Sequence, residues 1–298
     1  MNNNIFQELK FKVFKSGNPV AFYIGINVII YVLTALIGVG IMLGKGSLDL
    51  DELIREYFGF PSSFAALPLR FYTLLTFQFF HQGFLHLLFN MLGLFWLGQI
   101  FLDFLKPRQF HFVYLFSGAS GALVFLLGFN VFPVFAAAAG SATIIGASAS
   151  VMGIVVATAT LLPNYAIRLI LFGDVKLKYL ALAYVVLDLI GIGSANAGGS
   201  FAHLGGALFG FMYIKMLQNG TDWSTIFNTS QWFKKKSKLK VVKNENYRSS
   251  VNTRNRSEAS DKVNQQVIDS ILDKISKSGY DKLSKEEKET LFKASKHS

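Results

Sequence analysis

The chain has 298 residues, of which 52% are hydrophobic and 16% are charged, with a net charge of +11 and no cysteine. So little charge excludes an ordinary soluble protein of this length, and the missing cysteines exclude disulfides, thiolate nucleophiles and thiolate-bound metals. The positive excess lies mostly outside the apolar runs, which is typical of membrane topology signals, and we expect no nucleic-acid partner.

The amino-terminal segment 1–19 is basic, with Lys10, Lys12 and Lys15, and it precedes an apolar run at 20–43. This run is longer than the core of a signal peptide and has no evident A-x-A cleavage site. We therefore interpret it as an uncleaved first membrane span.

Six apolar runs reach or approach the roughly 20 residues that a helix needs to cross the hydrocarbon. They cover residues 20–43, 84–104, 109–130, 146–163, 177–193 and 200–218. The sequence therefore predicts an all-α polytopic membrane protein with a six-helix membrane domain over 20–218. The segment 44–83 is too irregular for a span and is expected at the membrane interface, and a short hairpin is expected over 166–178.

Lysine and arginine orient these spans. They occur in the amino-terminal tail, in the links after the second and fourth runs and in the carboxyl-terminal tail, whereas the links 131–145 and 193–200 carry no charge. The positive-inside rule then places both termini in the cytoplasm, as in a multi-pass protein of a bacterial inner membrane. The second, fourth and sixth spans all run from outside to inside.

Four polar side chains lie near the outer ends of those three spans. His86 and Asn90 lie near the start of the second, Ser148 near the start of the fourth and His203 near the start of the sixth. A serine hydroxyl becomes a nucleophile when a base removes its proton, and His203 is available as that base. The lysines and arginines that set the topology do not include these residues, so their common depth is independent evidence for a catalytic site.

Small residues predict that the fourth and sixth spans pack closely. Gly206 and Gly210 follow His203 on one face of the sixth span, and Gly153 lies in the fourth span. We assign Gly146 to the same helix-packing set. Such packing would bring the serine hydroxyl and the imidazole into hydrogen-bonding range.

A site for the oxyanion is also predicted. A helix that begins at Ser148 leaves the N–H groups of Ser148 and Ala147 free to donate, and Asn90 and His86 add side-chain donors from one helix face. Each feature alone has a simpler explanation, because small residues are routine at membrane helix interfaces and a histidine in a span can be structural. Their combination at one depth favours a site.

Three segments resemble the motifs of the rhomboid intramembrane serine proteases. Residues 146–149 are similar to the family's G-x-S-G, residues 202–210 to its A-H-x-x-G-x-x-x-G, and residues 86–90 to its H-x-x-x-N, while His81 resembles its extra histidine. The resemblance covers about residues 20–218.

The resemblance implies a Ser148 nucleophile and a His203 general base, as a dyad without an acidic third member. It implies an oxyanion site at Asn90, His86 and the Ser148 N–H. The implied partners are single-span membrane proteins, cut near the outer membrane face where their helix unwinds at small residues. Membrane lipids are expected as partners because the low charge of the chain indicates that much of it faces lipid. No metal or cofactor is implied.

Three places depart from the family's usual sequence pattern, and one further acidic residue lies in a span. Ala149 replaces the usual glycine after the nucleophile, Met152 stands where an aromatic residue often packs on the base, and residues 69–72 replace a Trp-Arg pair. Asp188 in the fifth span either completes a triad with His203 or serves gating or structural pairing.

The carboxyl-terminal part is polar. Residues 219–260 are predicted to form a basic, disordered linker, whose polybasic 234–240 either attracts anionic lipid or only retains topology. Residues 261–298 are predicted to form a small helical hairpin, with Gly279 ending the first helix and a capping box at 284–287 opening the second. Its partner, or its self-association, is left open.

Three functions remain open from the residues. The first is an active intramembrane serine protease, and the second is a catalytically silent relative that binds membrane proteins without cleaving them. The third is a small transporter in which His86 and His203 line a proton path, although no internal repeat supports it.

Overall fold

The computed structural model describes residues 4–169, 173–227 and 267–295. The chain divides into two units, Met1–Phe233 and Lys234–Ser298. The first unit carries the apolar helices and the candidate site, and the second carries the carboxyl-terminal helices.

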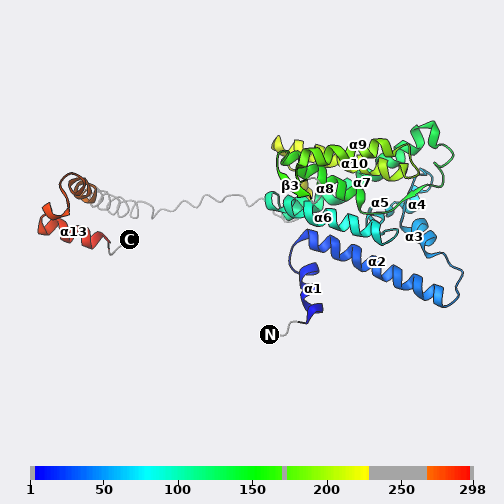
Figure 1. Cartoon of the computed structure of the whole chain (residues 1–298), viewed down its shortest axis with the longest axis horizontal. Coiled ribbons are helices and arrows are strands. Elements are labelled where there is room, and N and C mark those ends of the chain that lie inside the picture. Colours follow the sequence, from blue (N-terminus) through cyan, green and yellow to red (C-terminus); the bar gives the residue numbers. More distant parts are fainter. Residues whose placement is uncertain (1–3, 170–172, 228–266, 296–298) are drawn as a thin grey trace, which may run out of the picture. The chain divides into compact units, whose positions relative to one another are not determined.

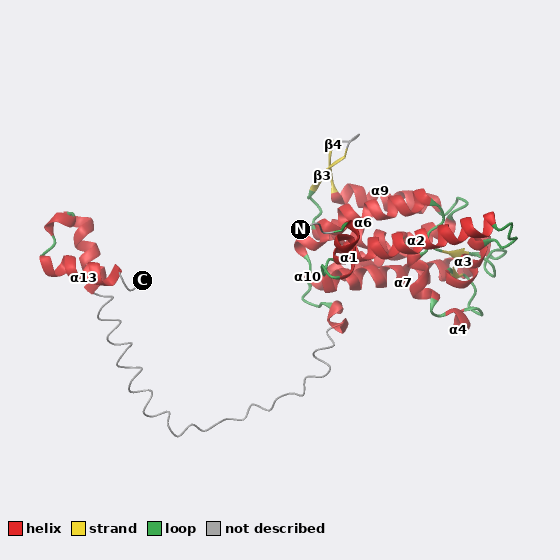
Figure 2. Ribbon diagram, turned by 90° about the horizontal axis from the view of Figure 1, so that it is seen from below, coloured by secondary structure: helices red, strands yellow, loops and turns green. Residues whose placement is uncertain are grey.

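The first unit is mostly helical (Figures 1 and 2). Its main helices are α1 (Ile5–Phe14), α2 (Pro19–Leu43), α6 (Phe84–Phe104), α7 (Pro107–Val131), α8 (Ser148–Leu161), α9 (Leu177–Gly191) and α10 (Ala197–Gln218). Among the described residues, α2, α6 and α7 are long and apolar enough to cross a membrane, and α8 is a shorter apolar helix. The six predicted spans coincide with helices, whereas α8 and α9 are only 14 and 15 residues long.

Short elements join α2 to α6 and build the predicted irregular segment. They are α3 (Leu50–Phe58), β1 (Phe60–Pro61), α4 (Leu67–Arg70), α5 (Thr73–Thr76) and the 3-10 turn η1 (Phe77–Phe79). β1 pairs antiparallel with β2 (Thr143–Ile144), which residues 145–147 join to α8. This pairing fixes the start of α8 against a segment that is about 80 residues away in the chain.

A second antiparallel pair, β3 (Ala166–Leu169) with β4 (Gly173–Lys176), confirms the predicted hairpin between α8 and α9. The hairpin projects from the helical unit next to the start of α9 (Figure 2).

The core is formed where α8 meets α7 and α10. Every residue of α8 from Ala149 to Ala159 is buried, so this helix is covered on all sides. A Cβ on Gly206 would overlap the carbonyl of Ala149, and one on Gly210 would overlap the carbonyl of Gly153. The two backbones therefore touch, as small residues at membrane helix interfaces allow.

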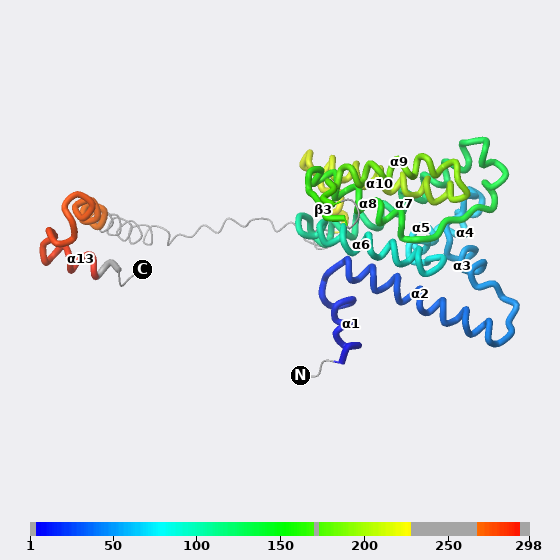
Figure 3. Tube along the Cα trace, viewed as in Figure 1, coloured from blue at the N-terminus to red at the C-terminus, as the bar shows by residue number. Residues whose placement is uncertain are grey.

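α2 lies at the edge of this core (Figure 3). Its amino-terminal half packs through Tyr23, whose ring stacks on Tyr114 of α7 at 3.8 Å, and through the buried Asn27. Its carboxyl-terminal half is apolar but exposed, with Leu36 at 63%. An apolar surface of this kind is unfavourable in water and is suited to lipid.

The second unit contains a helix over 267–278, the 3-10 turn η4 (Tyr280–Lys282) and α13 (Lys285–Ser295). Gly279 has φ +81° and ends the first helix, as predicted. The predicted capping box is also confirmed, because Glu287 accepts from the Ser284 N–H at 2.7 Å and donates its own N–H to Ser284 Oγ at 3.2 Å. The predicted linker beyond 227 and the first residues of the predicted hairpin lie outside the described residues.

Candidate active site

The turn before α8 positions Ser148. Gly146 has φ +129°, which a residue with a side chain rarely adopts, and its N–H donates to the Phe77 carbonyl at 2.9 Å. A Cβ on Gly146 would lie 2.7 Å from Cε1 of His86. Gly146 therefore lies before the helix and admits the His86 ring beside Ser148, which corrects its predicted assignment as a helix-packing residue.

The N–H groups at the start of α8 are not equivalent. Ala147 donates its N–H to Nε2 of His81 at 3.3 Å, so the prediction that this group is free for an oxyanion is wrong. Within the described part of the chain, the Ser148 N–H has no hydrogen-bond partner, as expected for the first turn of a helix. One backbone donor is therefore available beside the Ser148 hydroxyl.

His81 belongs to the segment between α2 and α6, outside the spans. Burial, together with the neighbouring His86, lowers the pKa of His81 to about 3. The ring is therefore neutral, and Nε2 can accept the Ala147 N–H. The His81 and His86 rings also meet edge to face at 5.1 Å, so His81 supports both the turn and His86.

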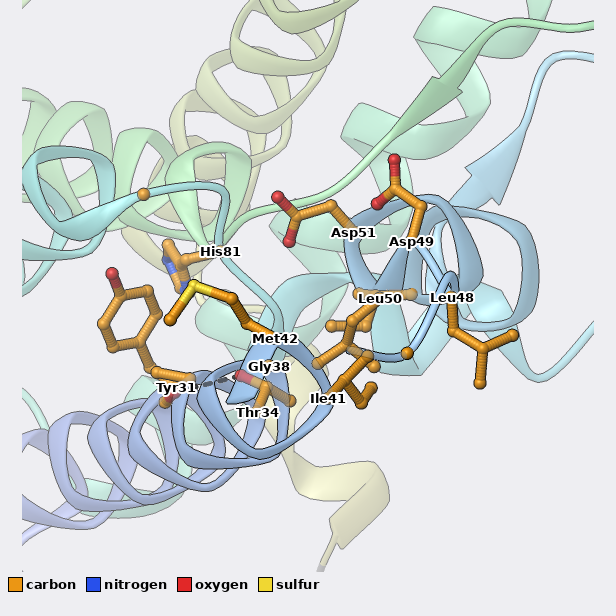
Figure 4. A pocket seen from close by; sticks show the side chains of 14 residues that line it. Tyr31, Thr34, Gly38, Ile41, Met42, Leu48, Asp49, Leu50, Asp51 and His81 are labelled. Atoms are coloured by element: carbon orange, nitrogen blue, oxygen red, sulfur yellow. Dashed lines mark hydrogen bonds between the residues drawn. The ribbon is translucent and has the colours of Figure 1, made fainter. Parts of the chain in front are cut away.

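His81 also borders a cavity of about 450 Å³ between α2 and α3 (Figure 4). Figure 4 shows Thr34 and Met42 of α2 on one side and Asp49 and Asp51 at the start of α3 on the other.

α6 contributes the other predicted donors. Asn90 is buried, and its Nδ2 donates to the His86 carbonyl one turn earlier at 2.8 Å. An amide nitrogen carries two N–H groups, so one remains for a ligand. His86 and Asn90 line the same cavity as Ser148 and His203.

The imidazole of His203 in α10 contacts a carboxylate of the neighbouring helix α9. Its Nδ1 lies 2.7 Å from Oδ1 of Asp188 in α9, and the two side chains are 23% and 13% exposed. The described residues contain no hydrogen bond between Ser148 Oγ and His203. The backbone contact between Gly206 and Ala149 brings the two helices together within one turn of both side chains.

The shared cavity has a volume of about 1390 Å³. α6 contributes an apolar wall with Leu85, Phe89 and Trp96, and α9 contributes the facing wall with Tyr184 and Leu187. The cavity therefore combines a small polar centre with long apolar flanks, as ligand sites commonly do.

Ala149 fits without displacing the site. A Cβ on Gly121 of α7 would lie 2.7 Å from the Ala149 Cβ, so the missing side chain of Gly121 provides the space for this methyl group. Met152 is buried and lines the cavity.

Sequence reasoning missed two parts of this arrangement. It did not assign His81 to the Ala147 N–H, and it left the pairing of Asp188 open. No group of three or more His, Asp or Glu that could hold a metal occurs within the described residues.

Comparison with known protein families finds two matching segments in the chain. The Rhomboid domain matches residues 68–219, just over half of the chain, and a family of unknown function (DUF6576) matches residues 258–297. No curated protein matches the chain. The matched Rhomboid segment contains α6 to α10, and with them the cavity-lining residues His86, Asn90, Ser148 and His203. The chain belongs to the rhomboid family of polytopic helical membrane proteins.

Proposed function

We propose that this protein is an intramembrane serine endopeptidase with Ser148 as nucleophile and His203 as general base. The observation that carries the proposal is the shared cavity, in which side chains from α6, α8 and α10 converge beside a free backbone N–H. Asn90 and His86 are the side-chain donors of the oxyanion site.

The chemistry follows from these positions. His203 takes the Ser148 hydroxyl proton as Oγ attacks the scissile carbonyl carbon, and the carbonyl oxygen becomes an oxyanion. The Ser148 N–H, with Asn90 and His86, stabilises that charge. His203 then gives the proton to the leaving amine, and it later activates a water that hydrolyses the acyl-enzyme and restores Ser148.

The apolar flanks of the cavity favour a membrane-spanning substrate. Phe89 and Trp96 of α6 and Leu187 of α9 are exposed large apolar side chains that also line the cavity. A single apolar helix that enters between α6 and α9 buries these surfaces, and its unwound end places a peptide bond at Ser148. Small residues at the cut site suit this arrangement, because an extended backbone must reach Oγ.

The proposal includes a topology of six spans with both termini in the cytoplasm. Ser148 begins α8, whereas Arg168 follows its end in the β3–β4 hairpin, so the nucleophile and this basic link belong to opposite ends of the helix. The positive-inside rule then places Ser148 toward the outer face.

The test uses purified protein in liposomes with a labelled single-span substrate. We expect cleavage and reaction with a serine-directed fluorophosphonate in the wild type, and loss of both in Ser148→Ala and His203→Ala. Ser47→Ala, which changes an exposed serine after α2, serves as the matched control and is expected to cleave normally. Substrate binding without cleavage or labelling would favour the silent relative, and equal cleavage by all variants would refute the assigned nucleophile.

A further inference from the structure

We infer that Asp188 is a positioning residue for His203, so that the site operates as a Ser148–His203–Asp188 triad. This inference rests on the proposed function and adds to it a third member from a different helix.

The geometry of the contact defines the role. The separation of 2.7 Å between His203 Nδ1 and Asp188 Oδ1 is that of a charge-assisted hydrogen bond. An ionised carboxylate only accepts, so Nδ1 must carry the proton. The lone pair of the neutral imidazole is then on Nε2, which is the nitrogen left to take the Ser148 proton.

The location of Asp188 argues against a chance surface pair. Its neighbours in the chain, Leu187 and Leu189, are 64% and 55% exposed, whereas the Asp188 side chain is 13% exposed. An acid in such a helix is costly unless it is paired. Within the described residues, its side-chain hydrogen-bond partner is His203.

The backbone fixes the relative position of the two helices. A Cβ on Gly191 would overlap the Ser200 Oγ, so α9 and α10 are in close contact there. Gly191 lies three residues after Asp188, and Ser200 lies three residues before His203. The hydrogen-bonded pair and the glycine contact therefore lie about one turn apart, which limits rotation of either helix.

A carboxylate in this place has two consequences for the reaction. It holds the ring in the tautomer that can act as a base, and it stabilises the positive charge when the ring is protonated. The other titratable or charged side chains that line the cavity are Arg55, His86 and Tyr184. These three side chains are present both in the wild type and in a variant that is changed only at Asp188, so they do not account for a difference between the two.

The experiment measures the rate of fluorophosphonate labelling and of substrate cleavage against pH in liposomes. Asp188→Asn keeps the shape and removes the charge, and we expect it to slow both reactions by about 100-fold or more. We also expect the acidic limb of its pH–rate profile to move to lower pH, which a purely structural role does not predict. Asp188→Glu should restore a substantial part of the rate, and Asp174→Asn, an exposed acid of β4, should match the wild type.

A second readout does not depend on activity. The chain has five histidines, so ¹⁵N-histidine spectra, assigned with His203→Gln, can report the protonation of Nδ1 directly. We expect a hydrogen-bonded Nδ1–H on His203 in the wild type and in Asp188→Glu, and its loss or shift in Asp188→Asn.

The outcomes separate the two proposals. Wild-type rates and pH profile in Asp188→Asn, with activity still lost in Ser148→Ala, would overturn the triad and leave the protease standing. Absence of cleavage and labelling in the wild type would defeat the protease, and an unchanged His203 spectrum in Asp188→Asn would then also overturn the pairing. If Asp188→Asn does not fold, a wild-type rate in a folded Asp188→Leu, or a His203 spectrum without an Nδ1–H in the wild type, overturns the inference.

Discussion

Two aspartates at different places in the membrane unit pair with basic side chains, and their surroundings differ. Asp222, after α10, accepts hydrogen bonds from Arg108, Gln109, Tyr213 and Ser224 at distances from 2.6 to 3.2 Å. Among the described residues, the Asp188 carboxylate accepts from one side chain, His203.

The number and type of partners separate a structural acid from a functional one. Asp222 is saturated by donors that do not titrate near neutral pH, and these donors join the start of α7 to the end of α10. Asp188 holds a single imidazole whose second nitrogen is left for chemistry. Each contact has a length of 2.7–2.8 Å to its basic partner, so distance alone would not distinguish them.

The largest expected effect separates the two aspartates: substitution of one should lower the reaction rate, and substitution of the other should lower the stability. Asp188→Asn should lower the labelling rate about 100-fold, equivalent to about 3 kcal/mol of barrier, with little change in the unfolding midpoint. The measurement is labelling and thermal unfolding of the same preparation. Parallel losses of rate and stability would remove the distinction.

Asp222→Asn should lower the stability and leave the reaction rate nearly unchanged. It leaves Arg108, which is 27% exposed, without its carboxylate, and we expect a loss of about 1–3 kcal/mol in the free energy of unfolding. Cleavage at a temperature where the variant stays folded should remain near the wild-type rate. A rate loss as large as that of Asp188→Asn would contradict the structural role.

Gly146→Ala tests the turn that places His86 beside Ser148. The strained φ should cost about 1–3 kcal/mol, and the new methyl group would displace the His86 ring. We expect a slower labelling rate with a lower unfolding midpoint, and Gly140→Ala, in an open loop position, as the control without either effect. An unchanged rate in Gly146→Ala would show that His86 need not lie against this turn.

Acidification should destabilise the turn through His81. Its pKa is lowered from 6.5 to about 3 on folding, so the stability it contributes is complete above pH 6.5 and is lost as pH falls toward 3. The loss approaches about 1.4 kcal/mol for each pH unit in that window. His81→Gln should flatten this part of the stability curve, and identical slopes in both proteins would contradict the assignment.

The smallest effect is expected at Ala149. Because Gly121 leaves space for the methyl group, Ala149→Gly should change the labelling rate by less than about threefold and the stability by about 1 kcal/mol. A large gain in rate would instead mean that the methyl group obstructs the nucleophile.

Much of this architecture could be predicted from hydrophobicity and charge. Long apolar runs located the helices, and the order of basic and uncharged links predicted that His86, Ser148 and His203 share one depth. The glycines of α10 also pointed to the contact with α8, because a helix repeat of 3.6 residues places them on one face.

The remaining details depend on angles and loop paths that local sequence does not determine. The rotation of α9 decides whether Asp188 faces lipid or His203. The path of residues 71–83 decides whether His81 reaches the Ala147 N–H, and the pairing of β1 with β2 joins segments with no sequence pattern in common. The positive φ that places Gly146 in a turn, and not at a helix interface, cannot be read from composition.

The most direct test of the central claim is to map the residue that a fluorophosphonate modifies. Wild-type protein in liposomes is labelled, digested and analysed by mass spectrometry, with Ser148→Ala and His203→Ala treated in parallel. The account predicts one modified peptide, carrying the adduct on Ser148, and its loss in both variants. An adduct on another serine, or equal labelling in His203→Ala, would contradict it.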